Sequence, residues 1–199
     1  MAIGATDDAP STDETAYLGS GLSLVGGTGF ARDGHPELHF PPLVPALVGV
    51  AGQVFPDPHT GTVVLTWMTG TAVVVPLSLL GRRLGGPAAG VNVAWVAALA
   101  PGLATTPSAR GAGSEAEYTL LAVAATWLAV TTADHPGRTR LARATGAGAC
   151  LGLAYLARPE GLLLALPLGV AVAGAAAVRR RPGTPAVRAA VPLMAAFAL

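Results

Sequence analysis

The chain has 199 residues with a formal net charge of +1; 52% of its residues are hydrophobic and 12% are charged. Soluble domains usually carry about 25% charged residues, so the composition predicts a membrane protein, and the small net charge gives no reason to expect a nucleic acid partner. The single cysteine, Cys150, excludes a disulfide framework or a cysteine zinc site within the chain.

Residues 1–61 form the polar N-terminal part of the chain. Here the pair Asp13-Glu14 is followed by Tyr17, and the run HFPPL begins at His39. The longest apolar run in this part, Leu43–Phe55, has thirteen residues, whereas a transmembrane helix needs about 17–25. We therefore predict an acidic loop that carries one helix, at about 43–55, lying in the membrane interface.

Six further apolar segments predict transmembrane helices. They cover about residues 62–80, 88–104, 118–133, 141–157, 161–178 and 189–199, and the last one reaches the end of the sequence. Small residues recur in them, as at Gly148 and Gly152, and let helices approach closely in lipid. The predicted fold class is all-α: a polytopic transmembrane helical bundle over residues 62–199, preceded by the acidic loop of residues 1–61.

The alternation of charge along the chain predicts how this bundle lies in the membrane. Nine of the twelve arginines fall in the connections after the first, third and fifth segments: Arg82, Arg83, Arg138, Arg140, Arg143, Arg179, Arg180, Arg181 and Arg188. Ten of the eleven acids fall on the opposite side, and only Asp134 shares the arginine side. The positive-inside rule makes the arginine side cytoplasmic. We therefore expect a multi-pass protein of the cell membrane whose first loop is extracytoplasmic.

Three charged groups then share the outer face: Asp13-Glu14, Glu115, and the turn Arg158-Pro159-Glu160. A carboxylate there can accept a proton from an acceptor hydroxyl while an arginine holds a phosphate. Each group also has a purely structural interpretation. The acidic pair can be solvated, Glu115 can be a first-turn acid, and Pro159-Glu160 can start a helix, since proline and an acid both suit that position.

A histidine metal site is a weaker hypothesis. His35 and His39 stand four residues apart, but Pro36 interrupts the helix that would align them. The run HPELH also lacks the order of the zinc motif HExxH. The spacing therefore does not favour a metal site at these histidines.

In their order along the chain, these motifs resemble the N-terminal portion of the GT-C membrane glycosyltransferases. These are the protein mannosyltransferase-like and aminoarabinose transferase-like enzymes (glycosyltransferase family 39-like). The matching residues are Asp13-Glu14 with Tyr17, HFPPL at 39–43, LGRRL at 80–84, Ser114-Glu115, and LARPEG at 156–161. The resemblance implies an enzyme that transfers a sugar from a polyprenyl-phosphate-linked donor to an extracytoplasmic hydroxyl or lipid acceptor. Its partners would be membrane lipid and that donor, with no nucleic acid.

The same resemblance implies roles for individual residues. Asp13 would be the catalytic base, and Glu14 would assist it or help to bind a metal. Arg158 would contact the carrier phosphate. The other expected substrate-binding residues are Tyr17, His39, Glu115 and Glu160. The sugar, the acceptor and the cofactor stay open; a divalent metal is compatible with the acidic pair.

Two features depart from the family pattern. Members begin with a transmembrane helix before the acidic pair, whereas twelve residues precede Asp13, and members continue beyond the sixth segment. We therefore expect a portion of such an enzyme. The alternatives are a polytopic transporter or permease, or a non-catalytic membrane fragment. Transporters place ionisable groups at mid-membrane, and the near absence of charge in the predicted spans favours the enzyme.

Overall fold

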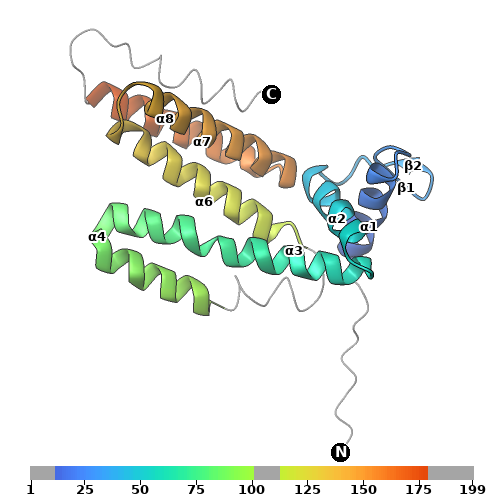
Figure 1. Ribbon diagram of the computed structural model, residues 1–199. Coiled ribbons are helices and arrows are strands. Elements are labelled where there is room, and N and C mark those ends of the chain that lie inside the picture. Colours follow the sequence, from blue (N-terminus) through green and yellow to red (C-terminus); the bar gives the residue numbers. More distant parts are fainter. Residues whose placement is uncertain (1–11, 101–112, 179–199) are drawn as a thin grey trace, which may run out of the picture.

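The computed structural model describes residues 12–100 and 113–178, and these residues are mostly helical. The all-α fold class is therefore confirmed. Figure 1 shows a bundle of long helices and, at one of its ends, a smaller unit that contains the N-terminal helices and a short hairpin. The predicted segment 189–199 lies outside the described residues.

The N-terminal unit consists of α1 (Thr12–Val25), the strands β1 (Ala31–Arg32) and β2 (His35–Pro36), and α2 (Leu43–Val54). The two strands pair antiparallel through a tight turn at Asp33 and Gly34, both with positive φ, as an Asp-Gly hairpin requires. The helix expected at 43–55 is α2. The prediction of a loop around the acidic pair was wrong, because Asp13 and Glu14 lie in the first turn of α1.

Packing against α2 explains why α1 forms. Acids in its first turn suit the positive end of the helix dipole. Ala16 and Tyr17 are buried, and Tyr17 packs in one cluster with Val44 and Val48 of α2. Gly21 of α1 lies against the backbone of α2, where a Cβ atom would overlap the carbonyl group of Pro45. The two helices therefore cross at backbone contact.

The bundle begins with α3 (Pro58–Ala72), which runs on into α4 (Val74–Leu99). The chain reverses inside α4 at Gly86, which has φ 83° and precedes Pro87. The Ser78 hydroxyl donates to the carbonyl of Gly90 at 3.1 Å, so the two halves of α4 pack against each other. This reversal falls between the segments predicted at 62–80 and 88–104.

The remaining helices are α6 (Glu115–Thr131), a 3-10 turn η1 (Thr132–Asp134), α7 (Gly137–Ala157) and α8 (Gly161–Val178). Their shared core is made of small and aliphatic side chains: Ala125, Ala129, Ala147, Leu151, Leu168 and Val172. Three helices begin about three or four residues earlier than the predicted spans at 62, 118 and 141. The helix α3 starts at Pro58 because Asp57 caps it and Pro58 occupies its first turn.

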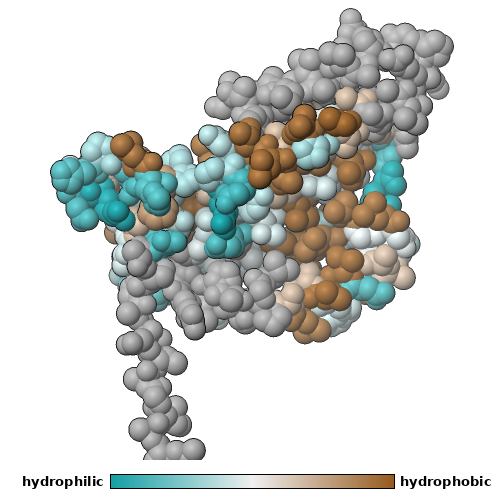
Figure 2. All heavy atoms as spheres, turned by 180° about the vertical axis from the view of Figure 1, so that it is seen from behind, coloured by the Kyte–Doolittle hydropathy of each residue, from teal (hydrophilic) through white to brown (hydrophobic). Residues whose placement is uncertain are grey.

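The outer surface of the bundle is apolar. Large hydrophobic side chains exposed there include Trp67, Met68, Val75, Val91, Trp95, Val96, Leu99, Leu163, Leu166 and Val170. Figure 2 shows hydrophobic residues gathered over the bundle and hydrophilic ones over the end that carries the hairpin. Within the described residues, two helical stretches are long and apolar enough to cross a membrane, Pro58–Leu99 and Glu115–Asp134.

Charge is separated along the bundle. At the end with the α4 reversal, Arg83 makes a bidentate ion pair with Asp134 of η1, with N–O distances of 2.8 and 3.1 Å. Near the same connection, the Arg143 guanidinium donates to the Thr131 hydroxyl at 2.8 Å and lies over the Trp127 ring. The acids of α1 and of the start of α6 lie at the opposite end. This separation matches the charge alternation on which the topology prediction depends.

Candidate functional site

The two acids of the N-terminal pair face different surroundings. Asp13 is exposed, whereas the Glu14 side chain is 1% exposed. Neighbouring residues of a helix point in different directions, so one acid faces solvent and the other enters the protein. Glu14 Oε1 lies 2.5 Å from Nδ1 of His59, a residue 45 positions later in the chain. Of the pair, Asp13 is therefore the carboxylate open to an incoming molecule.

The N-terminal cap of α3 fixes the backbone of His59. Asp57 accepts hydrogen bonds from the backbone N–H groups of His59 at 3.3 Å and Thr60 at 2.9 Å, and from the Thr60 hydroxyl at 2.8 Å. These bonds, those from Thr60 above all, lower the pKa of Asp57. Sequence reasoning missed His59. The run Asp57-Pro58, a helix cap followed by proline at the first position, places His59 on the first turn of a helix.

Tyr17 joins three segments of the chain. Its ring is buried and packs edge-on against the ring of Phe40, with centroids 4.9 Å apart. Burial raises the pKa of the Tyr17 hydroxyl, a hydrogen bond with Ser114 opposes that shift, and the charges of Asp13 and Glu115 add to it. The hydroxyl of Tyr17 therefore lies where α1 meets the start of α6.

Arg158 lies in the connection between α7 and α8 and is shared by two carboxylates. Its Nη1 donates to Glu115 Oε1 at 2.7 Å, and its Nη2 lies 3.6 Å from Glu160 Oε1. The guanidinium also stands over the ring of Tyr118, 6.0 Å from the centroid. The side chain is 31% exposed. A guanidinium has five N–H donors, so these contacts leave donors for a further anion.

The structure thus brings together most of the predicted site residues at one end of the bundle. We call this set the acid-end cluster; it consists of Asp13, Glu14, Tyr17, His59, Glu115, Arg158 and Glu160. Four carboxylates and one guanidinium give it a formal charge of −3 when His59 is neutral. The carboxylates favour cations and neutral hydroxyl groups, and Arg158 is the group of this cluster that attracts an anion.

His39 borders this cluster and lies on the surface. Its ring is exposed and meets the Phe40 ring edge-on, with centroids 4.8 Å apart, and Phe40 in turn contacts Tyr17. The backbone N–H of His39 donates to buried Glu37 at 2.8 Å. This bond is the main cause that lowers the pKa of Glu37, and Arg32 adds to it. Glu37 therefore shapes the turn that presents His39.

The described residues do not form a metal site. Among them, no group of three or more His, Cys, Asp and Glu side chains is placed to hold a metal ion. The oxygen Oε1 of Glu14, the residue expected to help bind a metal, instead lies against His59. These described residues therefore do not fit a metal on their own.

A further acid, Glu117, is buried between α6 and α3. It is 2% exposed, and its Oε1 accepts a hydrogen bond from the Thr69 hydroxyl at 3.0 Å. Its Oε2 has no hydrogen-bond partner among the described residues. Sequence reasoning counted Glu117 as an outer acid. The spacing alone could have shown this, because residues two positions apart in a helix, such as Glu115 and Glu117, face different sides of it.

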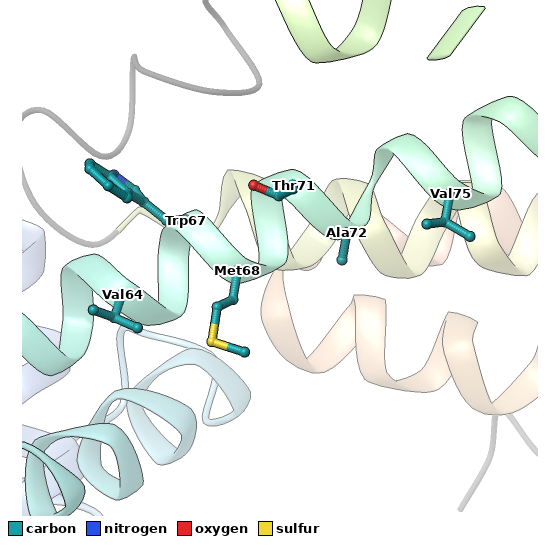
Figure 3. Close-up of a pocket in the computed structure, with 6 residues that line it drawn as sticks. All are labelled: Val64, Trp67, Met68, Thr71, Ala72 and Val75. Atoms are coloured by element: carbon teal, nitrogen blue, oxygen red, sulfur yellow. The ribbon is translucent and has the colours of Figure 1, made fainter. Parts of the chain in front are cut away.

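An apolar hollow runs along the outer face of α3 and the start of α4. Figure 3 shows the side chains that line it: Val64, Trp67, Met68, Thr71, Ala72 and Val75. They all come from one continuous helical stretch, and none of them is titratable. The hollow therefore suits contact with hydrocarbon and does not form a reaction site.

Comparisons with protein-family models, curated proteins and solved structures give no match for this chain. The case for a function therefore depends on the acid-end cluster and on the motifs that form it.

Proposed function

We propose that this chain forms part of a GT-C-like membrane glycosyltransferase that transfers a sugar from a polyprenyl-phosphate-linked donor to an extracytoplasmic hydroxyl or lipid acceptor. One observation carries the proposal. Tyr17 of α1 packs in one cluster with Ala157, the last residue of α7, and with Tyr118 of α6. Arg158 stands over the Tyr118 ring and donates to Glu115. This packing brings the helix that carries Asp13 to the connection that carries Arg158, at one end of the apolar bundle.

The chemistry assigned to these groups is general-base catalysis. The exposed carboxylate of Asp13 accepts the proton of the acceptor hydroxyl as its oxygen bonds to the anomeric carbon of the sugar. The bond from that carbon to the phosphate oxygen breaks, and the polyprenyl phosphate leaves with the electron pair. Arg158 donates its remaining N–H groups to the phosphate. Because Glu115 and Glu160 share Arg158, they limit its attraction for anions and hold its orientation.

The apolar bundle supports a donor that remains in the membrane. Two helical stretches reach the length and hydropathy of a membrane span, and exposed aliphatic and aromatic side chains cover the bundle. A polyprenyl chain dissolves in lipid beside such a surface, which delivers its phosphate to the membrane boundary. We place the acid-end cluster at the outer boundary, because five described arginines lie toward the opposite end of the bundle: Arg82, Arg83, Arg138, Arg140 and Arg143.

The test is sugar transfer from a radiolabelled polyprenyl-phosphate sugar in membranes that contain the full-length protein. Asp13→Asn keeps the shape and removes the proton acceptor, so turnover should fall about 10²–10⁴-fold, the usual contribution of general-base catalysis. Asp33→Asn is the matched control: Asp33 is exposed in the β1–β2 turn at φ 54°, a conformation that asparagine tolerates. Wild-type turnover by Asp13→Asn would remove the proposed base.

A second candidate function is transport, and Glu117 is the observation that favours it. A carboxylate buried between two helices, with one oxygen lacking a partner among the described residues, resembles the ionisable groups that handle ions in transporter bundles. The same membranes distinguish the two functions. If the protein is a transporter, Glu117→Gln should abolish uptake of its solute and Asp13→Asn should not. If it is a glycosyltransferase, Asp13→Asn should abolish sugar transfer and Glu117→Gln should not.

A further inference from the structure

We propose that His59 is a positioning residue for the acid-end cluster: its imidazole fixes Glu14 and thereby the helical turn from which Asp13 projects. This role rests on the proposed glycosyl transfer, because it concerns the placement of that reaction's base. His59 belongs to no motif in the sequence, and its part in the site follows from the geometry.

The bond between His59 and Glu14 joins two parts of the fold. Glu14 lies in the first turn of α1 and His59 in the first turn of α3. Their side chains meet at 2.5 Å, with Glu14 1% exposed and His59 43% exposed. The hydrogen bond joins Nδ1 of His59 to Oε1 of Glu14, whichever of the two atoms carries the proton. A buried carboxylate bonded in this way is costly to displace, and the first turn of α1 is held against α3.

The packing of α1 shows why such a link matters. This helix packs chiefly against α2 and has few contacts with α3. Asp13 precedes Glu14 directly, so a rotation that releases Glu14 also moves the carboxylate of Asp13. Arg158 and Glu115 are carried by other helices, and the distance from them to Asp13 depends on where α1 sits. Positioning errors of about 1 Å can reduce rates by about 10²-fold.

His59 is itself fixed at its backbone. Asp57 caps α3 and accepts the His59 N–H at 3.3 Å, and Pro58 occupies the first turn of the helix. A ring supported in this way can orient a partner, much as outer residues orient the groups that perform a reaction. The acid-end cluster therefore has a supporting chain that runs from Asp57 through His59 and Glu14 to Asp13.

The bond from Nδ1 allows a sharp test with two amides. Asparagine carries its amide nitrogen the same number of bonds from Cβ as Nδ1, whereas glutamine reaches to the position of Nε2. We expect His59→Asn in the full-length protein to keep kcat within about threefold of the wild type. His59→Gln and His59→Ala should lower kcat about 10–100-fold, as for other orienting residues. The KM for the donor should change little, because a positioning residue acts through Glu14 and Asp13 and not on the donor.

His35→Ala is the matched control, since His35 is exposed on β2 and outside the cluster. Equal kcat for His59→Asn and His59→Gln, or wild-type kcat for His59→Ala, would overturn the positioning role. Neither result would contradict the proposed glycosyl transfer. A rise in the KM for the donor with unchanged kcat would also overturn it, since that result indicates direct binding. Absence of transfer by the wild type would instead refute the proposed function, and the positioning role would fall with it. If the His59→Ala protein does not accumulate in the membrane, the kcat values of His59→Asn and His59→Gln decide whether His59 positions the cluster.

Discussion

Gly21→Ala tests whether the crossing of α1 and α2 places the acidic pair. A Cβ on Gly21 would lie 2.8 Å from the backbone nitrogen of Gly49 and still closer to the carbonyl of Pro45. Ordinary van der Waals contact begins at about 3.4 Å, so the helices must separate by more than half an ångström. Both neighbours are backbone atoms and cannot rotate away. Overpacking of this kind costs about 1–3 kcal/mol.

The matched control lies two residues earlier on the same helix. A Cβ on Gly19 would meet only the Arg32 side chain, at 3.7 Å. Gly19→Ala should therefore be neutral or stabilise the protein by up to about 1 kcal/mol through helix propensity. Thermal unfolding of the purified protein in detergent measures both variants, and the transfer assay shows whether Asp13 has moved. If Gly21→Ala melts at or above the temperature of Gly19→Ala, the backbone contact is not as described.

Three further predictions address the charges. Arg158→Ala should raise the KM for the donor about 10–100-fold, the value of a hydrogen bond to a charged group; an unchanged KM in the transfer assay would separate Arg158 from the phosphate. Glu117→Gln should raise the melting temperature by several degrees, since an incompletely bonded buried carboxylate costs about 1–3 kcal/mol; a lower melting temperature in detergent would show that the carboxylate has a partner. In a Cys150→Ala background, a cysteine that replaces Thr15 should react with an impermeant thiol reagent in intact cells, and one that replaces Arg138 should not. Labelling of both positions would refute the orientation in which the acidic end faces outward.

The helices of the bundle could be predicted because hydropathy is a local property of the sequence. Each predicted span within the described residues contains helix, and Gly86-Pro87 falls where a turn was expected. The errors lie at helix starts. The first turns of α3 and α7 are polar, so a search for apolar residues begins too late. Capping residues such as Asp57 mark these starts better than hydropathy does.

The missed helix α1 shows what local patterns leave out. Its sequence, TDETAYLGSGLSLV, begins with four polar residues and contains two glycines, which is typical of a loop. Gly21 is compatible with a helix here because it lies against the backbone of α2. The stabilising contact comes from another segment, and most helical stability in proteins has that origin. The Glu14–His59 bond escaped prediction for the same reason, since it joins residues 45 positions apart.

The surroundings of Asp13 and Glu14 decide how the acidic pair can work. Two adjacent carboxylates in a flexible loop would be equivalent, and either could act as the base. In α1 they differ, because Glu14 is buried against His59 while Asp13 stays exposed. The helix therefore gives the two acids separate tasks, proton acceptance for Asp13 and placement for Glu14.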